Sequence, residues 1–66
     1  MRYYSTQRPV MPGGFPRPAG TKIIIIHNFD RRTYCPDIDR MAWGWIEYDT
    51  ELSGKDANDY ELVKAD

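Results

Sequence analysis

The strongest apolar run in the chain is the block of four isoleucines from Ile23 to Ile26. Isoleucine is β-branched and favours extended backbone, and the block is bounded by Gly20 and by the polar Asn28. The pattern therefore predicts a strand over Lys22–Phe29, and we expect it to be the central strand of a sheet. Because its apolar positions are continuous rather than alternating, either both faces are covered or one face is left for a partner.

A second apolar segment, Ala42–Asp49, alternates and also predicts a strand, adjacent to the first. Its tryptophans are expected to be core residues, since each can bury about 150–250 Å². An exposed tryptophan would instead be a hot spot for binding. The intervening glycine predicts a bulge or a close approach of two backbones. One face of this strand carries Trp43, Trp45 and Glu47, and the other carries Ala42, Gly44, Ile46 and Tyr48.

The acidic last third of the chain contains a helix start. Ser53 is suited to be the N-cap, and Asp56 follows it by three residues. These signals predict a short helix over about Gly54–Tyr60 that covers one face of the sheet. Leu62 and Val63 come next, and they form a final edge strand or simply pack the C-terminus onto the sheet.

The remaining segments are turns, loops and one short strand. Arg2–Thr6 predicts a short strand, because it combines two tyrosines with serine and threonine. Pro9–Gly20 contains four prolines, which exclude a helix or an inner strand and leave an extended loop or arm. Asp30–Arg40 is a polar connection in which Asp37 could cap one helical turn over Ile38–Met41.

Together these elements predict one α+β domain: a small antiparallel sheet of three or four strands with one short helix and a proline-rich N-terminal arm. Residues 1–21 are expected to be the arm, with its short strand, and residues 22–66 the compact core. A chain of 66 residues has no room for a two-domain enzyme with a cleft. It has no apolar run near the roughly 18 residues that span a bilayer, and no secretory signal, so we expect a cytoplasmic protein without a membrane partner.

Charge is distributed unevenly although the formal net charge is only −1. Residues 1–22 carry four basic side chains and no acidic one, whereas residues 41–66 carry seven acidic and two basic side chains. Ends of opposite charge can fold against each other, pair between two copies, or face separate partners. In a domain of this size we expect the first arrangement.

Candidate catalytic chemistry is limited to His27 and Cys35. A cysteine needs a base or a positive field to populate its thiolate, and the two residues are more typical of a hydrogen-bonded histidine and an inert thiol. One histidine and one cysteine do not make a zinc site. Gly14–Lys22 departs from a phosphate-binding loop, because five residues separate its glycines and a strand follows it. We therefore expect no enzyme activity, no metal and no cofactor.

Candidate binding residues lie in the middle of the chain. Two adjacent arginines could contact a phosphate backbone, and nearby aromatic side chains could stack on bases. Against nucleic-acid binding stands the acidic last third, because nucleic-acid modules commonly carry a positive excess. The candidate binding set is Arg31, Arg32, Tyr34, Arg40, Trp43 and Trp45.

Four strings cover most of the chain: YYSTQRPVMPG, HNFDRRTY, AWGWIEY and YELV, which begin at Tyr3, His27, Ala42 and Tyr60. In these strings the chain resembles a group of short uncharacterised proteins and domains from mobile elements and phage-like regions of gut-dwelling Firmicutes. Similar small domains are attached to large plasmid or phage proteins. The resemblance implies a role in element transfer or counter-defence, and it implies no catalytic residue.

The leading functional hypothesis is a non-enzymatic accessory module that binds another protein, or a second copy of itself through an exposed strand edge. One alternative is a nucleic-acid-binding module that uses Arg31 and Arg32. Another is an inhibitor of a host defence enzyme whose acidic surface, including Asp56, Asp59 and Glu61, occupies a basic channel.

Overall fold

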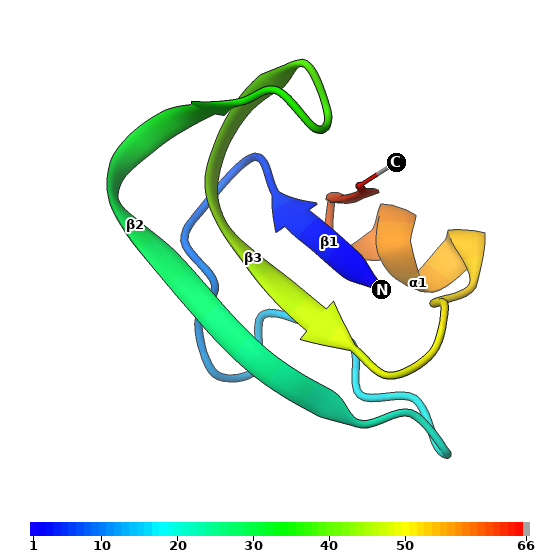
Figure 1. Cartoon of the computed structure of the whole chain (residues 1–66). Helices are drawn as coiled ribbons and strands as arrows, with labels where there is room; N and C mark the ends of the chain where they lie inside the picture. Colours follow the sequence, from blue (N-terminus) through cyan, green and yellow to red (C-terminus); the bar gives the residue numbers. More distant parts are fainter. Residues whose placement is uncertain (66) are drawn as a thin grey trace.

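The computed structural model describes residues 1–65. They form a four-stranded antiparallel sheet in the order β2-β3-β1-β4, with one short helix at its β4 side (Figure 1). The predicted α+β fold class is confirmed. Within these residues, no helix has both the length and the hydropathy to cross a bilayer. The elements are β1 (Arg2–Ser5), β2 (Ile23–Cys35), β3 (Arg40–Tyr48), α1 (Gly54–Asp59) and β4 (Leu62–Lys64).

Strand β3 is the central strand, between β2 and β1. Its alternation is confirmed, because Ala42, Gly44, Ile46 and Tyr48 are buried while the residues between them are half-buried. The two tryptophans were expected to be core residues; both are half-buried, and Trp45 packs against a second, smaller core cluster. The small and aliphatic side of β3 faces the main core, so the tryptophan side is left on the more open face of the sheet.

The isoleucine-rich strand was predicted to be central, and it is instead the edge strand β2. Ile24, Ile25 and Ile26 are 63%, 51% and 40% exposed. The reason lies in the topology: β1 pairs with the other side of β3 and β4 pairs with β1, so the two remaining strands both lie beyond β3 and neither lies beside the free side of β2. The continuous apolar run allowed either a strand covered on both faces or one left partly uncovered, and the structure has the partly uncovered strand.

Strands β2 and β3 form a long, irregular hairpin. The register slips twice along β2, between Ile23 and Ile25 and between Asn28 and Thr33. The turn spans residues 36–39, and Asp39 adopts a left-handed φ of 54°. The helical turn predicted over Ile38–Met41 does not form, because Met41 already pairs within the strand and the hairpin closes in four residues.

The proline-rich segment does not stand at the rim as an arm. The Asn28 side chain accepts a 2.8 Å hydrogen bond from the Val10 amide and donates one of 2.8 Å to the Val10 carbonyl. These two hydrogen bonds between the strand and the loop hold the segment against the sheet, and Val10 and Phe15 are buried. The core therefore includes residues from the first third of the chain and is not confined to residues 22–66.

Gly44 makes this loop attachment sterically feasible. A Cβ at residue 44 would lie 2.4 Å from the His27 carbonyl oxygen and 2.7 Å from the Asn28 Oδ1 atom. The predicted close approach at this glycine is confirmed, since Asn28 crosses directly over it to reach Val10.

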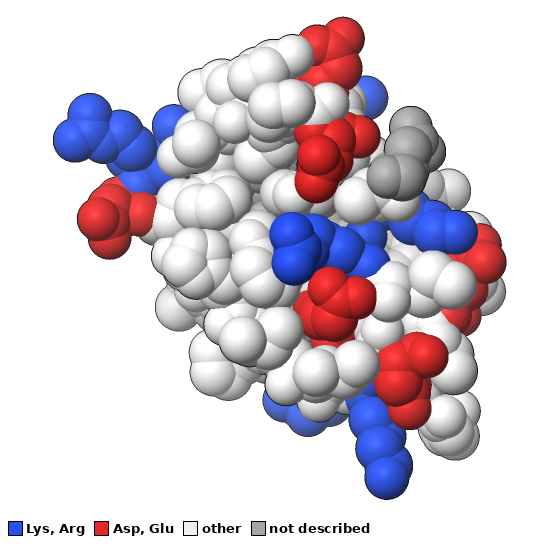
Figure 2. Space-filling model, viewed as in Figure 1, with Lys and Arg blue, Asp and Glu red and all other residues white. Residues whose placement is uncertain are grey.

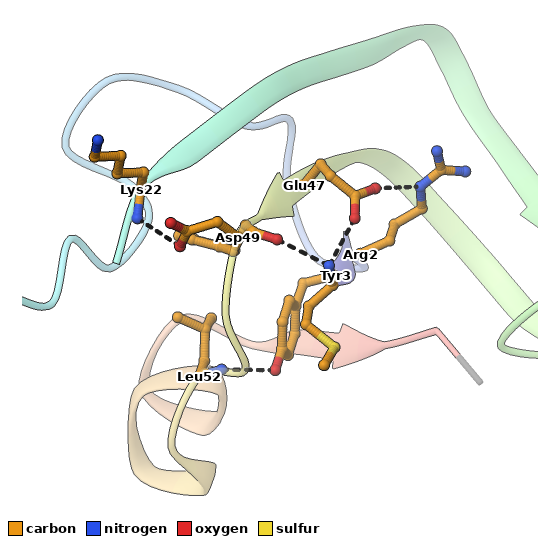
Figure 3. A network of polar contacts seen from close by, with 8 residues as sticks. Arg2, Tyr3, Lys22, Glu47, Asp49 and Leu52 are labelled. Carbon is orange, nitrogen blue, oxygen red and sulfur yellow. Dashed lines mark hydrogen bonds and ion pairs between the residues drawn. The ribbon is translucent and has the colours of Figure 1, made fainter. Parts of the chain in front are cut away.

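The main core lies between the sheet and the loop, with residues around α1 closing one side. The Tyr3 and Tyr48 rings meet edge to face at 5.8 Å. The Leu52 amide donates a 2.8 Å hydrogen bond to the Tyr3 hydroxyl (Figure 3), and the Tyr48 hydroxyl donates one of 2.8 Å to the Pro16 carbonyl. Burial raises the pKa of Tyr48 to about 12. The buried members of this cluster are Tyr3, Val10, Phe15, Ile46, Tyr48, Leu52 and Leu62.

The predicted helix and final strand are both present. The Ser53 hydroxyl accepts a hydrogen bond from the Asp56 amide at 3.1 Å, so Ser53 is the N-cap, and Tyr60 is the C-cap. Strand β4 then pairs with β1. The helix packs beside β4, at the side of the sheet opposite β2, and its Ala57 packs against the main core (Figure 1). It therefore covers the β4 end of the sheet rather than the β2–β3 pair. The loop covers that pair instead.

Candidate functional site

The most unusual surface of the domain is the open edge of β2. Among residues 1–65, β2 is the longest strand, at 13 residues, and it pairs with β3 along one side only. The other side presents backbone N–H and C=O groups that an additional strand could bind. The exposed isoleucines Ile24 to Ile26 lie on this same stretch. We call the segment from Ile24 to Asn28 the open edge.

An aromatic group lies on the sheet face next to the open edge. The His27 ring stacks on Trp45 at 5.4 Å between centroids, and its edge meets Phe29 at 5.3 Å. The Arg2 guanidinium lies 3.8 Å from the centroid of Trp45. Cation–π and stacking contacts of this kind fix the rings, so the face is a rigid platform.

A carboxylate network holds the Arg2 side of this platform. Glu47 accepts a 2.7 Å bond from the amine of Met1 and a 3.3 Å bond from Arg2 (Figure 3). The hydrogen bond from that amine lowers the pKa of Glu47, with Arg2 adding to the effect. Glu47 therefore carries a negative charge at neutral pH and orients the Arg2 guanidinium over the indole.

Trp43 and Trp45 lie on the same side of β3. Both are half-buried. Trp45 packs against the second, smaller core cluster of Tyr4, Cys35 and Ala42, with its ring between Arg2 and His27. Trp45 is thus both a wall of a small core and part of the platform.

The predicted arginines lie on the outward bulge of β2. Arg31 and Arg32 fall where the register slips, and both are exposed. Next to them is a shallow depression of about 400 Å³. The bulge thus carries cationic groups to one end of the open edge. The depression is lined by His27, Asn28, Phe29, Asp30, Arg31 and Thr33.

The remaining candidates lie at the tip of the hairpin. Tyr34 is exposed, and its hydroxyl donates a hydrogen bond to the Asp39 carboxylate, which raises the pKa of Tyr34. Arg40 is exposed and opposite Cys35 in the register. The predicted set is therefore divided between the bulge, the platform and the tip. It omitted the isoleucines, whose continuous run was the available signal.

His27 and Cys35 have different surroundings in the structure. Cys35 is 4% exposed, and its thiol donates a weak bond to the Thr33 carbonyl. Burial raises the pKa of this thiol, and the nearby Asp37 carboxylate adds to the effect. The ring neighbours of His27 are Trp45 and Phe29. Among residues 1–65, no group of three or more metal-ligating side chains is present.

The oppositely charged ends of the chain fold against each other, as expected. Arg2 binds Glu47, and Arg8 binds Glu61. Asp59 also has an internal partner, Lys55, at 2.7 Å. Figure 2 shows the consequence: uncharged residues form a broad area over the side of the molecule that contains β2 and β3, and acidic and basic groups lie next to one another elsewhere.

Comparison with known families identifies the domain. The profile of the family described as defence against restriction A, C-terminal, matches residues 1–66. The chain belongs to this family. A search of curated proteins and a search of solved structures found no match. Within a defence against restriction A C-terminal domain, the open edge, the platform and the cationic bulge are therefore the surface features available for a function.

Proposed function

We propose that this defence against restriction A C-terminal domain is a non-enzymatic accessory module of a mobile element, which binds a protein by adding a strand to β2. The observation that carries the proposal is the open edge itself. There an unpaired side of the longest strand coincides with three consecutive exposed isoleucines.

Leaving this edge in water has an energetic cost. Each fully buried isoleucine contributes about 1.5–3 kcal/mol relative to an exposed one, so three exposed isoleucines forgo a large share of a small domain's stability. Natural sheets usually protect their edges with charges, prolines or short strands. Strand addition would bury these side chains and satisfy the backbone groups together.

The platform supports specificity in the same binding mode. Successive side chains of an added strand point to opposite faces of the sheet. On the platform face they would meet His27, whose ring stacks on Trp45, and Phe29, whose ring contacts His27. Rigid aromatic side chains lose little entropy on binding and are enriched at hot spots.

Affinity capture with matched variants tests the proposal. Ile25→Lys places a charge on the open edge, and Met11→Lys makes the same change at an apolar side chain that is 61% exposed on the loop. A protein partner should be retained by the wild type and by Met11→Lys, and at least about tenfold less by Ile25→Lys. The retained protein is then purified, and amide exchange of Ile24–Asn28 is measured with and without it.

Protection of the open-edge amides by the purified partner supports strand addition. Equal retention of every protein by the wild type and both variants would contradict it. Circular dichroism and thermal unfolding of each variant verify that the sheet is intact.

A second candidate is nucleic-acid binding by the bulge, which the exposure of Arg31 and Arg32 beside Phe29 favours. Binding to a single-stranded oligonucleotide would weaken steeply with salt and would fall when both arginines are replaced by alanine. Retention that does not depend on salt, or on these arginines, removes this candidate.

A further inference from the structure

We infer that the strand added to β2 is the β2 strand of a second copy of this chain, paired antiparallel about a two-fold axis at Ile26. The inference rests on the proposed function, because it uses the same open edge, and it names the partner. The two four-stranded sheets would then become one continuous sheet. Such a pairing is closed, because each copy offers the same edge to the other.

The apolar composition of the open edge suits self-pairing. With Ile26 on the axis, Ile26 of one copy lies opposite Ile26 of the other, and Ile25 lies opposite His27. In an antiparallel pair, directly opposite side chains lie on the same face and contact each other. Each copy would therefore cover Ile25 and Ile26 of the other with an aromatic and an apolar side chain.

The two faces of the strand agree with this register. Ile26 pairs with the buried Ile46 of β3, so both lie toward the loop-covered face. Ile25 and His27 pair with Glu47 and Trp45, which lie on the platform face. A two-fold axis perpendicular to the sheet keeps each face continuous, so Ile25 meets His27 on one face and Ile26 meets its own copy on the other.

Charge favours the register with Ile26 on the axis over the register with His27 on the axis. With Ile26 on the axis, Lys22 of one copy comes close to Asp30 of the other; both residues flank the open edge, and the register slip before Ile25 lies between Lys22 and the axis. With His27 on the axis, Lys22 would instead lie opposite Arg32, and two like charges would meet twice in the dimer. Like charges directly opposite each other destabilise a strand pair.

The two charges are available for this contact. Asp30 and Lys22 are both exposed. Among residues 1–65, neither side chain forms an ion pair within the chain. The Lys22 contact to Asp49 uses the backbone amide rather than the ammonium group (Figure 3).

Sedimentation equilibrium of the 66-residue chain, from about micromolar to millimolar concentration, tests the inference. The wild type should dimerise, Ile25→Lys should be monomeric, and Met11→Lys should dimerise like the wild type. Lys22→Glu and Asp30→Lys each create two like-charge contacts in the dimer, so each should weaken dimerisation by about tenfold at low salt.

Combining the two reversals is the decisive step. In a mixture of the Lys22→Glu and Asp30→Lys chains, both contacts join opposite charges, and the heterodimer should regain wild-type affinity. The double variant Lys22→Glu/Asp30→Lys should regain it as a homodimer. Recovery in both cases requires residue 22 of each copy to lie near residue 30 of the other.

Three results would overturn the inference: a wild type that stays monomeric at every concentration, single reversals that dimerise as well as the wild type, or a double variant that does not recover. A monomeric chain whose open-edge amides are protected by a captured protein overturns self-pairing alone. A monomeric chain with no capture that depends on Ile25 overturns the proposed function as well. Circular dichroism confirms the fold of each variant.

Discussion

The two edges of this sheet are built in opposite ways. β4 has three residues, is preceded by Glu61 in a left-handed conformation, and lies beside α1. Its Lys64 reaches Glu51 at 3.4 Å, and the following Ala65 amide bonds to β1. β2 has 13 residues and presents exposed isoleucines.

The two edges differ in the features that serve folding and the features that serve binding. An edge that serves only the fold is kept short and bent, as β4 is, because a long bare edge invites another strand. β2 keeps its length and apolar character although the loop already anchors it through Asn28. Substitutions on the anchored side of β2 should therefore affect folding, and substitutions on its open side should affect association.

The largest expected effect comes from the glycine beneath the loop anchor. Gly44→Ala places a methyl group 2.4 Å from the His27 carbonyl oxygen, and backbone must move to relieve the contact. We expect the free energy of unfolding to fall by about 3–5 kcal/mol in urea denaturation. Gly54→Ala is the control, because a Cβ there meets nothing within 4 Å. Equal stability of the two variants would show that β2 and β3 separate freely at this point.

The second-largest loss of stability is expected from replacing Asn28, whose side chain holds the loop. Asn28→Ala leaves the Val10 amide and carbonyl without their partner in a partly buried position. We expect a loss of about 2–3 kcal/mol, because unpaired polar groups keep their desolvation penalty. Lys64→Ala, on the β4 edge, removes only an exposed ion pair and should change the free energy of unfolding by less than about 0.5 kcal/mol. An unchanged stability of Asn28→Ala would show that the loop is held by its apolar contacts alone.

Alkaline pH should loosen the same loop-covered face. Burial raises the pKa of Tyr48 from 10.0 to about 12, so the folded state favours the protonated phenol. Its contribution is fully present below pH 10 and is lost as pH rises through about 12. The loss should be on the order of 2 kcal/mol. Urea denaturation at several alkaline pH values measures it, and Tyr48→Phe should remove this part of the pH dependence.

On the β4 side, the helix cap is expected to contribute less to stability than Gly44 or Asn28 does. Ser53→Ala removes the hydroxyl that accepts from the Asp56 amide, and we expect a loss of about 1 kcal/mol. Ser53→Asp should retain most of the wild-type stability, since aspartate caps equally well. If both variants lose the same amount, the contribution of Ser53 is packing rather than capping.

The sequence predicted the elements whose formation depends on residues only a few positions apart. The alternation in β3 and the Ser53–Asp56 spacing gave the correct strand and helix, because period and capping act within a few residues. The edge position of β2 was not predictable, because four consecutive isoleucines fit a buried strand equally well. The Asn28–Val10 contact joins residues that are 18 apart in the sequence, so no local pattern predicts it. The place of Trp45 in the platform depends on the pairing of β1 with β3, which brings Arg2 to the indole ring.

The smallest expected effect on stability is on the open edge itself. Ile25 is half exposed, so Ile25→Thr keeps the β-branched backbone preference and removes little buried surface. We expect the free energy of unfolding to change by less than about 0.5 kcal/mol. Leu62→Ala on the β4 edge, where the side chain is 6% exposed, should lose as much as an ordinary core truncation.

Thermal and urea unfolding of these two variants at low concentration, where the chain is monomeric, isolate folding from association. If Ile25→Thr destabilises the monomer as strongly as Leu62→Ala, the isoleucines contribute to the fold rather than to binding. If it leaves the monomer unchanged and weakens the dimer, β2 keeps its isoleucines for the surface that they form with another strand.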